Sequence, residues 1–427
     1  MWRSLLVLGF FGIVLAGCGS PRPKLGTDNL QCGLKENKFY VDDVFEQNHV
    51  YLKTLGRKSG GTATNILELS AGGEYGAYGA GFLEGWGKVG AAGRPVPRDD
   101  VRIVTGVSTG SMMATYAFLG HRDAELRKLY DNLKDEMIYK KNNWIKLLWA
   151  NSLYGTEGKR ALLKKYLTSE IIDQVAAAPA GRFLYIGMVN LDTGEFKRVD
   201  MVALARGIHD KALRDDCYRA VIDASSAIEI AFEPVFIDNS MFGDGGARSH
   251  LFLVSPETIA VGMKDNDLSG STYRSFALIH DDLEVEQQRT DNGVLPIAER
   301  TASISTDQTL KDSVRLTHAL VIDPATIVGA DAAKKMPTFI QYYAAAATRA
   351  CECKDKWAKT CEKSSKSGVA DTFCQPYMQC LSAGGEQDGQ EYATTGNWLP
   401  FEKLNLGSGP ACNVQQGHPY RVRPAFR

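Results

Sequence analysis

The order of hydrophobic and polar positions along the chain predicts short strands that alternate with helices. Apolar runs at residues 66–69 and 101–105 have strand length, and each is followed by a segment that contains glycine. Residues 111–119 are almost entirely apolar, which is typical of a helix buried on most sides, and Gly120 suits its C-terminus. Residues 123–137 carry apolar side chains at helical spacing and predict one amphipathic helix.

The middle of the chain continues this alternation. Residues 183–190 and 196–201 flank an Asp-Thr-Gly turn, which predicts a β-hairpin. Residues 217–226 suit another helix, and Pro234 favours extended chain through residues 235–237. Strands that alternate with helices indicate an α/β fold, with a mainly parallel central sheet covered on both faces.

The N-terminus has the pattern of an export signal. Arg3 precedes an apolar run at residues 5–15, which is shorter than the roughly 20 residues that a spanning helix needs. The segment Leu15-Ala16-Gly17-Cys18 resembles the lipobox of bacterial lipoproteins. This resemblance implies that residues 1–17 are a signal peptide and that Cys18 is lipidated. A plain secretory signal with an incidental cysteine is the alternative.

Lipidation at Cys18 would place the protein in the bacterial cell envelope. Two or three acyl chains hold a protein stably on a membrane. Gly19 follows Cys18, so the aspartate of the inner-membrane retention signal known from enteric bacteria is absent. We therefore expect an outer-membrane anchor that faces the periplasm or the cell surface, with residues 18–61 as tether and N-terminal segment.

Cysteine usage agrees with an exported chain. Nine cysteines are present, and removal of Cys18 leaves an even set of eight, as expected for disulfides in an oxidising compartment. Six of them lie beyond residue 350, so residues 331–427 are expected to form a cysteine-rich C-terminal extension stapled by disulfides. A zinc site is the competing interpretation, but no Cys-x-x-Cys occurs and no histidine lies between Cys351 and Cys412.

Overall composition excludes one class of partner. The 427 residues are 44% hydrophobic and 23% charged, with a formal net charge of −1. Lys and Arg form no contiguous stripe, so a nucleic-acid partner is not expected. Protein partners and oligomeric state cannot be read from this composition.

The first candidate for chemistry is Gly106-Val107-Ser108-Thr109-Gly110, between the strand at 101–105 and the helix at 111–119. A serine on a sharp strand-to-helix turn is held with its hydroxyl pushed outward, and Gly106 and Gly110 make room for the tight turn. The helix that begins there directs backbone N–H groups at developing negative charge. Ser108 is therefore the candidate nucleophile, with a purely structural turn as the alternative.

The second candidate is the glycine-rich segment at residues 70–81, which follows the strand at 66–69. The N–H groups of Gly72 and Gly73 could point at one oxygen and form an oxyanion hole. A dinucleotide-binding loop is the alternative, because residues 85–90 match G-x-G-x-x-G. No strand precedes that match and no acidic residue follows at the required spacing, so residues 85–90 are expected to be a loop with a chance match.

The third candidate is Phe242-Gly243-Asp244-Gly245-Gly246-Ala247. Asp-Gly is an ordinary turn signal, but an aspartate fixed in a glycine turn can also approach a serine hydroxyl closely. Asp244 is therefore the candidate base, and Gly245 and Gly246 complete its motif.

Taken in order, these three motifs resemble the patatin-like phospholipases over roughly residues 63–265. The resemblance implies a three-layer α/β/α sandwich at residues 62–330 that hydrolyses lipid acyl esters without metal or other cofactor. It implies Ser108 as nucleophile, Asp244 as base, and Gly72 and Gly73 as oxyanion donors. Two positions depart from the family's G-G-G-x-[RK]-G loop: Ala71 replaces the first glycine and Tyr75 the basic residue.

Three further interpretations stay open from the sequence. A Ser-His-Asp triad could use Asp244 with His280 or His318. A catalytically silent lipoprotein that binds lipid or an envelope protein could use the same fold. Residues 144–149, Trp-Ile-Lys-Leu-Leu-Trp, could form a lid or bilayer contact, although core packing is the favoured interpretation.

Overall fold

The computed structural model describes the greater part of the chain, in segments that include the three motifs. The described residues are 22–37, 39–40, 64–89, 101–138, 140–141, 152, 154–229, 231–252, 273–281, 283, 289–322, 339–343, 346–364 and 372–396. Cys18, the rest of residues 1–21 and residues 144–149 lie outside these segments, so the predictions made for them stay predictions.

A nine-stranded sheet forms the centre of the described structure. Eight strands follow the order β1-β8-β9-β6-β3-β2-β10-β11, and β7 pairs with β6 beside this path. The strands are β1 (Asn29–Leu30), β2 (Thr64–Leu69), β3 (Val101–Val107), β6 (Phe183–Asn190), β7 (Phe196–Asp200), β8 (Val235–Ile237), β9 (Ser240–Asp244), β10 (Tyr273–Leu278) and β11 (Phe339–Tyr343). A separate antiparallel pair joins β4 (Lys140–Lys141) to β5 (Tyr154–Gly155).

The sheet is parallel at its centre and mixed on one side. The neighbours β11, β10, β2, β3 and β6 run parallel, whereas β6 pairs antiparallel with both β7 and β9. β3 and β6 are almost wholly buried, as expected for strands that have helices on both faces. The sequence-based expectations of a mainly parallel α/β sheet and of the β6–β7 hairpin are therefore confirmed.

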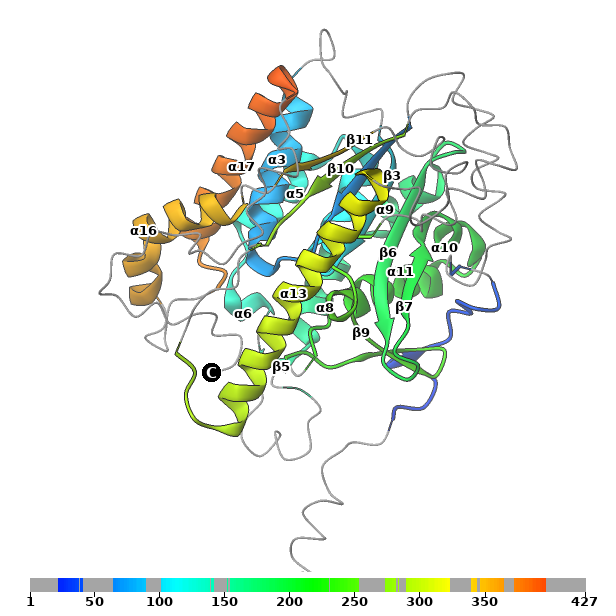
Figure 1. The fold of residues 1–427 in the computed structure, drawn as a ribbon. Helices are drawn as coiled ribbons and strands as arrows, with labels where there is room; N and C mark the ends of the chain where they lie inside the picture. The colour runs from blue at the N-terminus through cyan, green and yellow to red at the C-terminus, as the bar shows by residue number, and fades with distance from the viewer. Residues whose placement is uncertain are drawn as a thin grey trace, which may run out of the picture.

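Helices cover both faces of this sheet (Figure 1). α13 crosses in front of the strands in that view, and α3, α5 and α11 lie behind them. The helices and 3-10 turns are η1 (Gly73–Tyr75), α3 (Gly76–Lys88), α4 (Thr109–Leu119), α5 (Asp123–Asp131), α6 (Asp135–Ile138), α8 (Glu157–Tyr166), α9 (Ser169–Ala176), α10 (Met201–Gly207), α11 (Lys211–Ser225), η3 (Gly245–Ala247), α13 (Val294–Ile322), α16 (Ala346–Ser364) and α17 (Gln375–Thr395).

Two expectations about helices are wrong. The single helix expected at residues 123–137 is interrupted, because α5 ends at Asp131 and α6 begins at Asp135. The amides of Asn132 and Leu133 bond three residues back instead of four, which tightens and ends α5. The expectation of a loop at residues 85–90 is also wrong, because α3 continues through Lys88. This glycine pattern therefore does not form a dinucleotide-binding turn.

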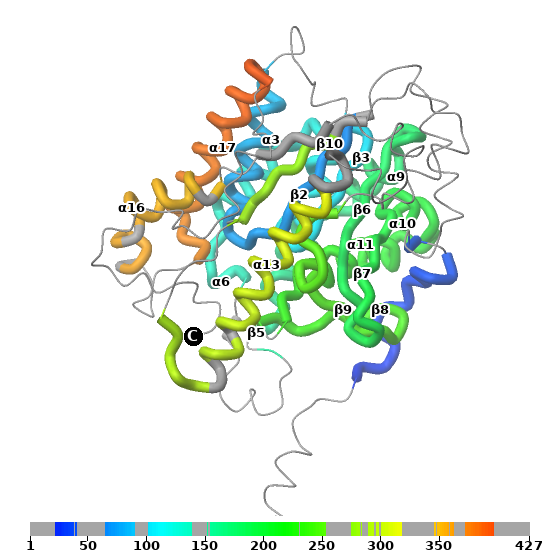
Figure 2. Tube along the Cα trace, viewed as in Figure 1, coloured from blue at the N-terminus to red at the C-terminus, as the bar shows by residue number. Residues whose placement is uncertain are grey.

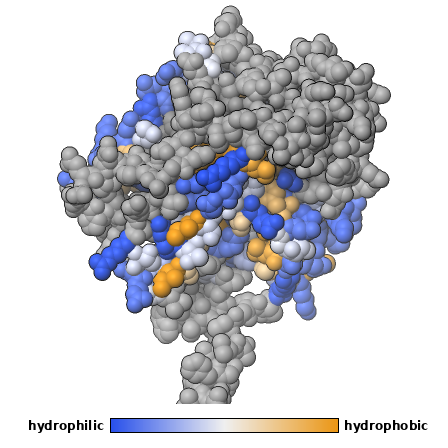
Figure 3. Space-filling view, in the orientation of Figure 1, coloured by the Kyte–Doolittle hydropathy of each residue, from blue (hydrophilic) through white to orange (hydrophobic). Residues whose placement is uncertain are grey.

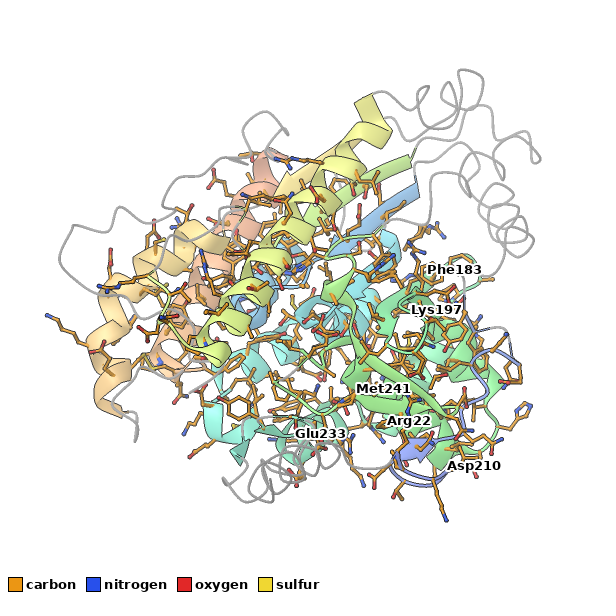
Figure 4. All side chains as sticks on the ribbon, turned by 60° about the horizontal axis from the view of Figure 1, so that its bottom comes forward. Arg22, Phe183, Lys197, Asp210, Glu233 and Met241 are labelled. Atoms are coloured by element: carbon orange, nitrogen blue, oxygen red, sulfur yellow. A yellow bond between two sulfur atoms is a disulfide. The ribbon has the colours of Figure 1, made fainter. Side chains whose placement is uncertain are left out.

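The described N-terminal segment is tied to the edge of the sheet. Cys32 forms a disulfide with Cys217 of α11, across 185 residues of sequence. The Asp238 carboxylate accepts hydrogen bonds from the amides of Cys32 and Gly33, at 2.7 and 2.8 Å. Figure 4 shows Arg22 beside Met241 of β9, where the Arg22 guanidinium bonds a carboxylate of the β6–β7 turn. This segment is thus part of the folded body.

The C-terminal extension packs on the main body through α17. In Figure 2 α17 runs beside α3, and the two helices meet at glycines. A β-carbon at Gly81 or Gly85 of α3 would collide with the α17 backbone, and one at Gly385 or Gly389 of α17 would collide with the α3 backbone. Such close approach of two backbones requires small residues along both helices. Buried side chains of α17 consequently belong to the same hydrophobic core as the sheet.

Disulfides cross-link this extension, as expected from the sequence. Cys353 pairs with Cys380 and links α16 to α17, and Cys361 pairs with Cys374. Cys351 is also disulfide-bonded. These pairings use the thiols that the zinc interpretation would require, and no group of metal ligands occurs within the described segments.

The surface shown in Figure 3 mixes polar areas with small apolar ones over α13. Ile297, Ile304 and Leu316 of this helix are 44–58% exposed. Among the described residues, no helix is both long and apolar enough to span a bilayer.

Candidate active site

Ser108 lies at the turn from β3 into α4, in a strained backbone conformation. Its φ of 53° and ψ of −120° are unusual for a residue other than glycine, and the side chain is almost buried, at 7% exposure. The Ser108 amide donates a hydrogen bond to the Ser225 hydroxyl at 3.1 Å, and Ser225 donates to the Gly187 carbonyl at 2.6 Å. These bonds connect the turn to α11 and β6 and so stabilise its strained backbone conformation.

The glycines on either side of Ser108 are required by close packing. A β-carbon at Gly106 would lie 2.5 Å from the Gly110 carbonyl oxygen, so the two glycines face each other across the turn. A β-carbon at Gly110 would collide with the Leu69 carbonyl at the end of β2. The G-x-S-x-G spacing therefore lets the turn close and lets α4 start against the neighbouring strand.

The glycine-rich loop begins where β2 ends, beside this turn. A β-carbon at Gly72 would collide with the His280 carbonyl, whereas Gly73, with φ of 54°, faces open space. The Thr109 hydroxyl donates to the Gly73 carbonyl at 2.7 Å and so links the loop to the start of α4. Neither the Gly72 nor the Gly73 amide has an acceptor in the described part of the chain. Both amides are therefore available to an external oxygen.

Asp244 ends β9 and reaches the same edge of the sheet. A β-carbon at Gly245 would lie 2.6 Å from the Gly187 carbonyl oxygen and 2.8 Å from the Val107 side chain, next to Ser108. This close approach brings the aspartate to the turn. The Gly246 amide donates to Asp244 Oδ1 at 2.7 Å and fixes the orientation of the carboxylate.

The Asp244 carboxyl group is buried, and only one of its two oxygens accepts a hydrogen bond from the described residues. It is 4% exposed, and burial raises its pKa to about 6, while the neighbouring Ser108 hydroxyl, the Gly246 amide and Lys159 lower the pKa in part. Oδ2 has no hydrogen-bond partner among the described residues. The Ser108 hydroxyl is thus close enough to Asp244 to lower its pKa, although the two side chains form no hydrogen bond of full geometry.

Two charged residues near Asp244 were not found from the sequence. Glu229 lies against Gly243, where a β-carbon would be 2.5 Å from Glu229 Oε1. Burial and then the charge of Asp244 raise the Glu229 pKa to about 7. Lys159 of α8 is 3% exposed and pairs with Asp223 at 2.8 Å.

Lys159 also stabilises the turn that leads toward Asp244. Its ammonium group donates to the carbonyls of Asp223 and Ser226, both at 3.0 Å, at the C-terminus of α11. A cation at this end of a helix is favoured by the helix dipole. No local pattern marks Lys159, because the groups it contacts lie more than 60 residues away in the sequence.

Of the two histidines considered for a triad, the structure describes the side chain of His280. Its ring bonds the Ser70 carbonyl at 2.9 Å and packs over Gly79 of α3, and no hydrogen bond to Ser108 or Asp244 is found among the described residues. The His318 side chain lies outside the described part. His250 instead approaches Asp244, since a β-carbon at Gly246 would lie 3.3 Å from its Nε2 and 3.0 Å from Asp244 Oδ1.

The match to a protein family supports the fold and the class of chemistry. Residues 67–255 match the family described as patatin-like phospholipase. No curated protein matches the chain. Among solved structures, VipD from Legionella pneumophila is similar at 11% identity and a TM-score of 0.32, over 84% of this chain and 93% of that one.

The family match spans all three motifs. It begins within β2, immediately before the glycine-rich loop, includes the turn at Ser108, and ends after Asp244. The resemblance inferred from the motifs is confirmed at the level of the family, and the roles of the individual residues stay predictions. Residues 67–255 thus form a patatin-like phospholipase domain, which supports lipid acyl hydrolase activity.

Proposed function

We propose that the protein hydrolyses acyl esters of membrane lipids through a dyad of Ser108 and Asp244. Asp244 accepts the proton of the Ser108 hydroxyl as Oγ attacks the ester carbonyl carbon. The amides of Gly72 and Gly73 donate to the oxyanion, and its collapse expels the alcohol, which takes the proton from Asp244. Water then attacks the acyl-serine with Asp244 again as base, which releases the fatty acid and restores the serine.

One observation carries this proposal: the strained Ser108 lies beside a buried carboxylate whose Oδ2 has no partner. A pKa near 6 makes Asp244 a better base than an exposed aspartate, yet leaves it ionised at neutral pH. The unbonded amides of Gly72 and Gly73 supply the third element that acyl transfer requires.

We further propose that the protein works from the membrane that holds its substrate. Lipidation of Cys18 would tether it to the cell envelope. The exposed apolar side chains of α13 would be compatible with a lipid surface. Phospholipids and neutral lipids share the acyl ester that the site would attack.

Labelling by a fluorophosphonate probe tests the nucleophile. We expect the wild-type protein to be labelled and Ser108→Ala to be unlabelled. Ser169→Ala is a matched control, because the Ser169 hydroxyl likewise lies beside a carboxylate, that of Asp215, but at the start of α9 without a strained turn. Labelling that persists in Ser108→Ala would refute the assignment, and absence of labelling and of p-nitrophenyl ester hydrolysis in the wild type would favour a silent lipid-binding protein.

The position of His250 makes a Ser-His-Asp triad the second candidate. A dyad predicts that His250→Asn keeps most of the esterase activity, whereas a triad predicts its loss with the fold intact. His280→Gln serves as the control for burial, because His280 is equally buried but bonds the Ser70 carbonyl. Loss of activity in His250→Asn alone would replace the dyad by the triad.

A further inference from the structure

A lysine of the C-terminal extension contacts the glycine-rich loop. Lys354 lies on α16, and its Nζ is 3.3 Å from the Tyr75 hydroxyl and 5.6 Å from the centre of the Tyr75 ring. Tyr75 is 8% exposed and ends η1, the turn that begins at Gly73. A cation within about 6 Å of a ring centre is attracted by the π electrons, so this contact favours one orientation of Tyr75.

The lysine is held in place by covalent and packing restraints. The adjacent Cys353 is bonded to Cys380 of α17, so the turn of α16 that carries Lys354 is fixed to α17. Arg349, also on α16, bonds Asp388 of α17. α17 itself packs backbone to backbone against α3, the helix that continues from η1.

Charged contacts add to this packing on both sides of the helix pair. The Tyr78 hydroxyl of α3 donates to Asp388 at 2.9 Å. Lys88 of α3 pairs with Glu386 at 2.7 Å, and Arg127 of α5 pairs with the same carboxylate. The extension therefore holds α3 along its length and reaches η1 at the N-terminal end through Lys354.

We propose that the disulfide-linked pair of α16 and α17 positions the oxyanion loop, with Lys354 as the positioning residue that acts through Tyr75. Fixing the Tyr75 ring fixes the backbone of η1 and so the direction of the Gly73 amide, two residues before it. The loop has no basic side chain of its own at this turn, and the extension supplies the cation from a distant part of the sequence. This inference rests on the proposed oxyanion role of the loop.

Charge removal at Lys354 tests the inference. We expect Lys354→Gln to lower kcat on a soluble p-nitrophenyl ester by about tenfold with KM nearly unchanged, less than the ~10²–10³ that loss of a whole oxyanion donor costs. Lys354→Arg should keep most of the activity, because a guanidinium can make the same contact. Lys356→Gln is the matched control: it removes the same charge from the same helix, where Lys356 lies over the ring of Trp357.

The two disulfides give an independent test. Cys353→Ser/Cys380→Ser should lower kcat as Lys354→Gln does, and Cys361→Ser/Cys374→Ser, which lies farther along α16, should lower it less. Thermal unfolding and the rate of fluorophosphonate labelling at Ser108 are measured for every variant. Equal kcat in the wild type and in folded Lys354→Gln overturns the inference, as does an equal loss in Lys356→Gln. A wild type that is never labelled at Ser108 overturns the proposed function instead.

Discussion

Replacement of Asp244 by Asn should abolish activity and stabilise the protein at neutral pH. Burial raises the pKa of this carboxyl group from 3.8 to about 6, so the folded state binds more protons than the unfolded state between these values. The contribution of Asp244 to the free energy of unfolding therefore falls as the pH rises through that window. Above it, the ionised carboxylate is a buried charge that destabilises the folded state.

The size of the effect follows from the pKa shift. Two pKa units at 1.36 kcal/mol each correspond to about 3 kcal/mol at neutral pH. Asn stays neutral, can accept the Gly246 amide at Oδ1, and places an amide donor where Oδ2 now lies without a partner. Removal of the Asp244 charge also lowers the pKa of Glu229, which adds stability in the same direction.

Urea unfolding of the wild type and Asp244→Asn at about pH 4 and pH 7.5 measures this difference. We expect the variant to be more stable at the higher pH and the advantage to vanish at the lower pH. Ser108→Ala is the control, because it removes the nucleophile but leaves the carboxylate. A variant that is less stable than the wild type at pH 7.5, or equally stabilised at both values, would contradict the assigned burial and charge of Asp244.

Three further variants probe the packing and the charges around the site. Gly110→Ala places a β-carbon on the Leu69 carbonyl, and should cost about 1–3 kcal/mol in unfolding free energy and more than about a hundredfold in kcat. Gly120→Ala is the control for kcat: its β-carbon meets no neighbour, and its left-handed φ of 79° should lower stability but leave kcat nearly unchanged. Lys159→Met removes one cation from the buried Asp223 carboxylate, so urea unfolding should show a loss of about 3 kcal/mol in unfolding free energy. The acid limb of the pH–rate profile should also move to higher pH, because Lys159 lowers the pKa of Asp244. Glu229→Gln should raise the unfolding free energy by about 2 kcal/mol at pH 8 but not at pH 5, because its pKa of about 7 leaves the partly buried carboxyl ionised only at the higher value.

The three motifs could be predicted from the sequence because each is a local feature. Glycines within two residues of the side chain mark the turn at Ser108 and the turn at Asp244, and a short apolar run precedes the turn at Ser108. How the two motifs meet is not local: β9, which carries Asp244, runs antiparallel to β6, and the register of that pair places Asp244 opposite Met188, close to the end of β3.

The remaining parts of the site depend on contacts that are distant in the sequence. Lys159, Glu229 and Lys354 carry no local signal, because what each one does is set by a neighbour that folding brings to it. The four glycines at the crossing of α3 and α17 oppose helix formation by propensity, yet both segments are helical because the close approach of the two backbones compensates. That compensation is why residues 85–88 are helical and not a loop.

The crossing of α3 and α17 also has a consequence for the order of events during synthesis. Tyr78, Phe82 and Trp86 of α3 bury their rings, and Phe82 and Trp86 meet Tyr392 near the end of α17 at 5.9 and 5.2 Å between ring centres. Until α17 has been synthesised, the helix next to the glycine-rich loop keeps an uncovered aromatic face. A chain that stops before residue 346 would thus hold all three motifs and still lack the helices that cover this face.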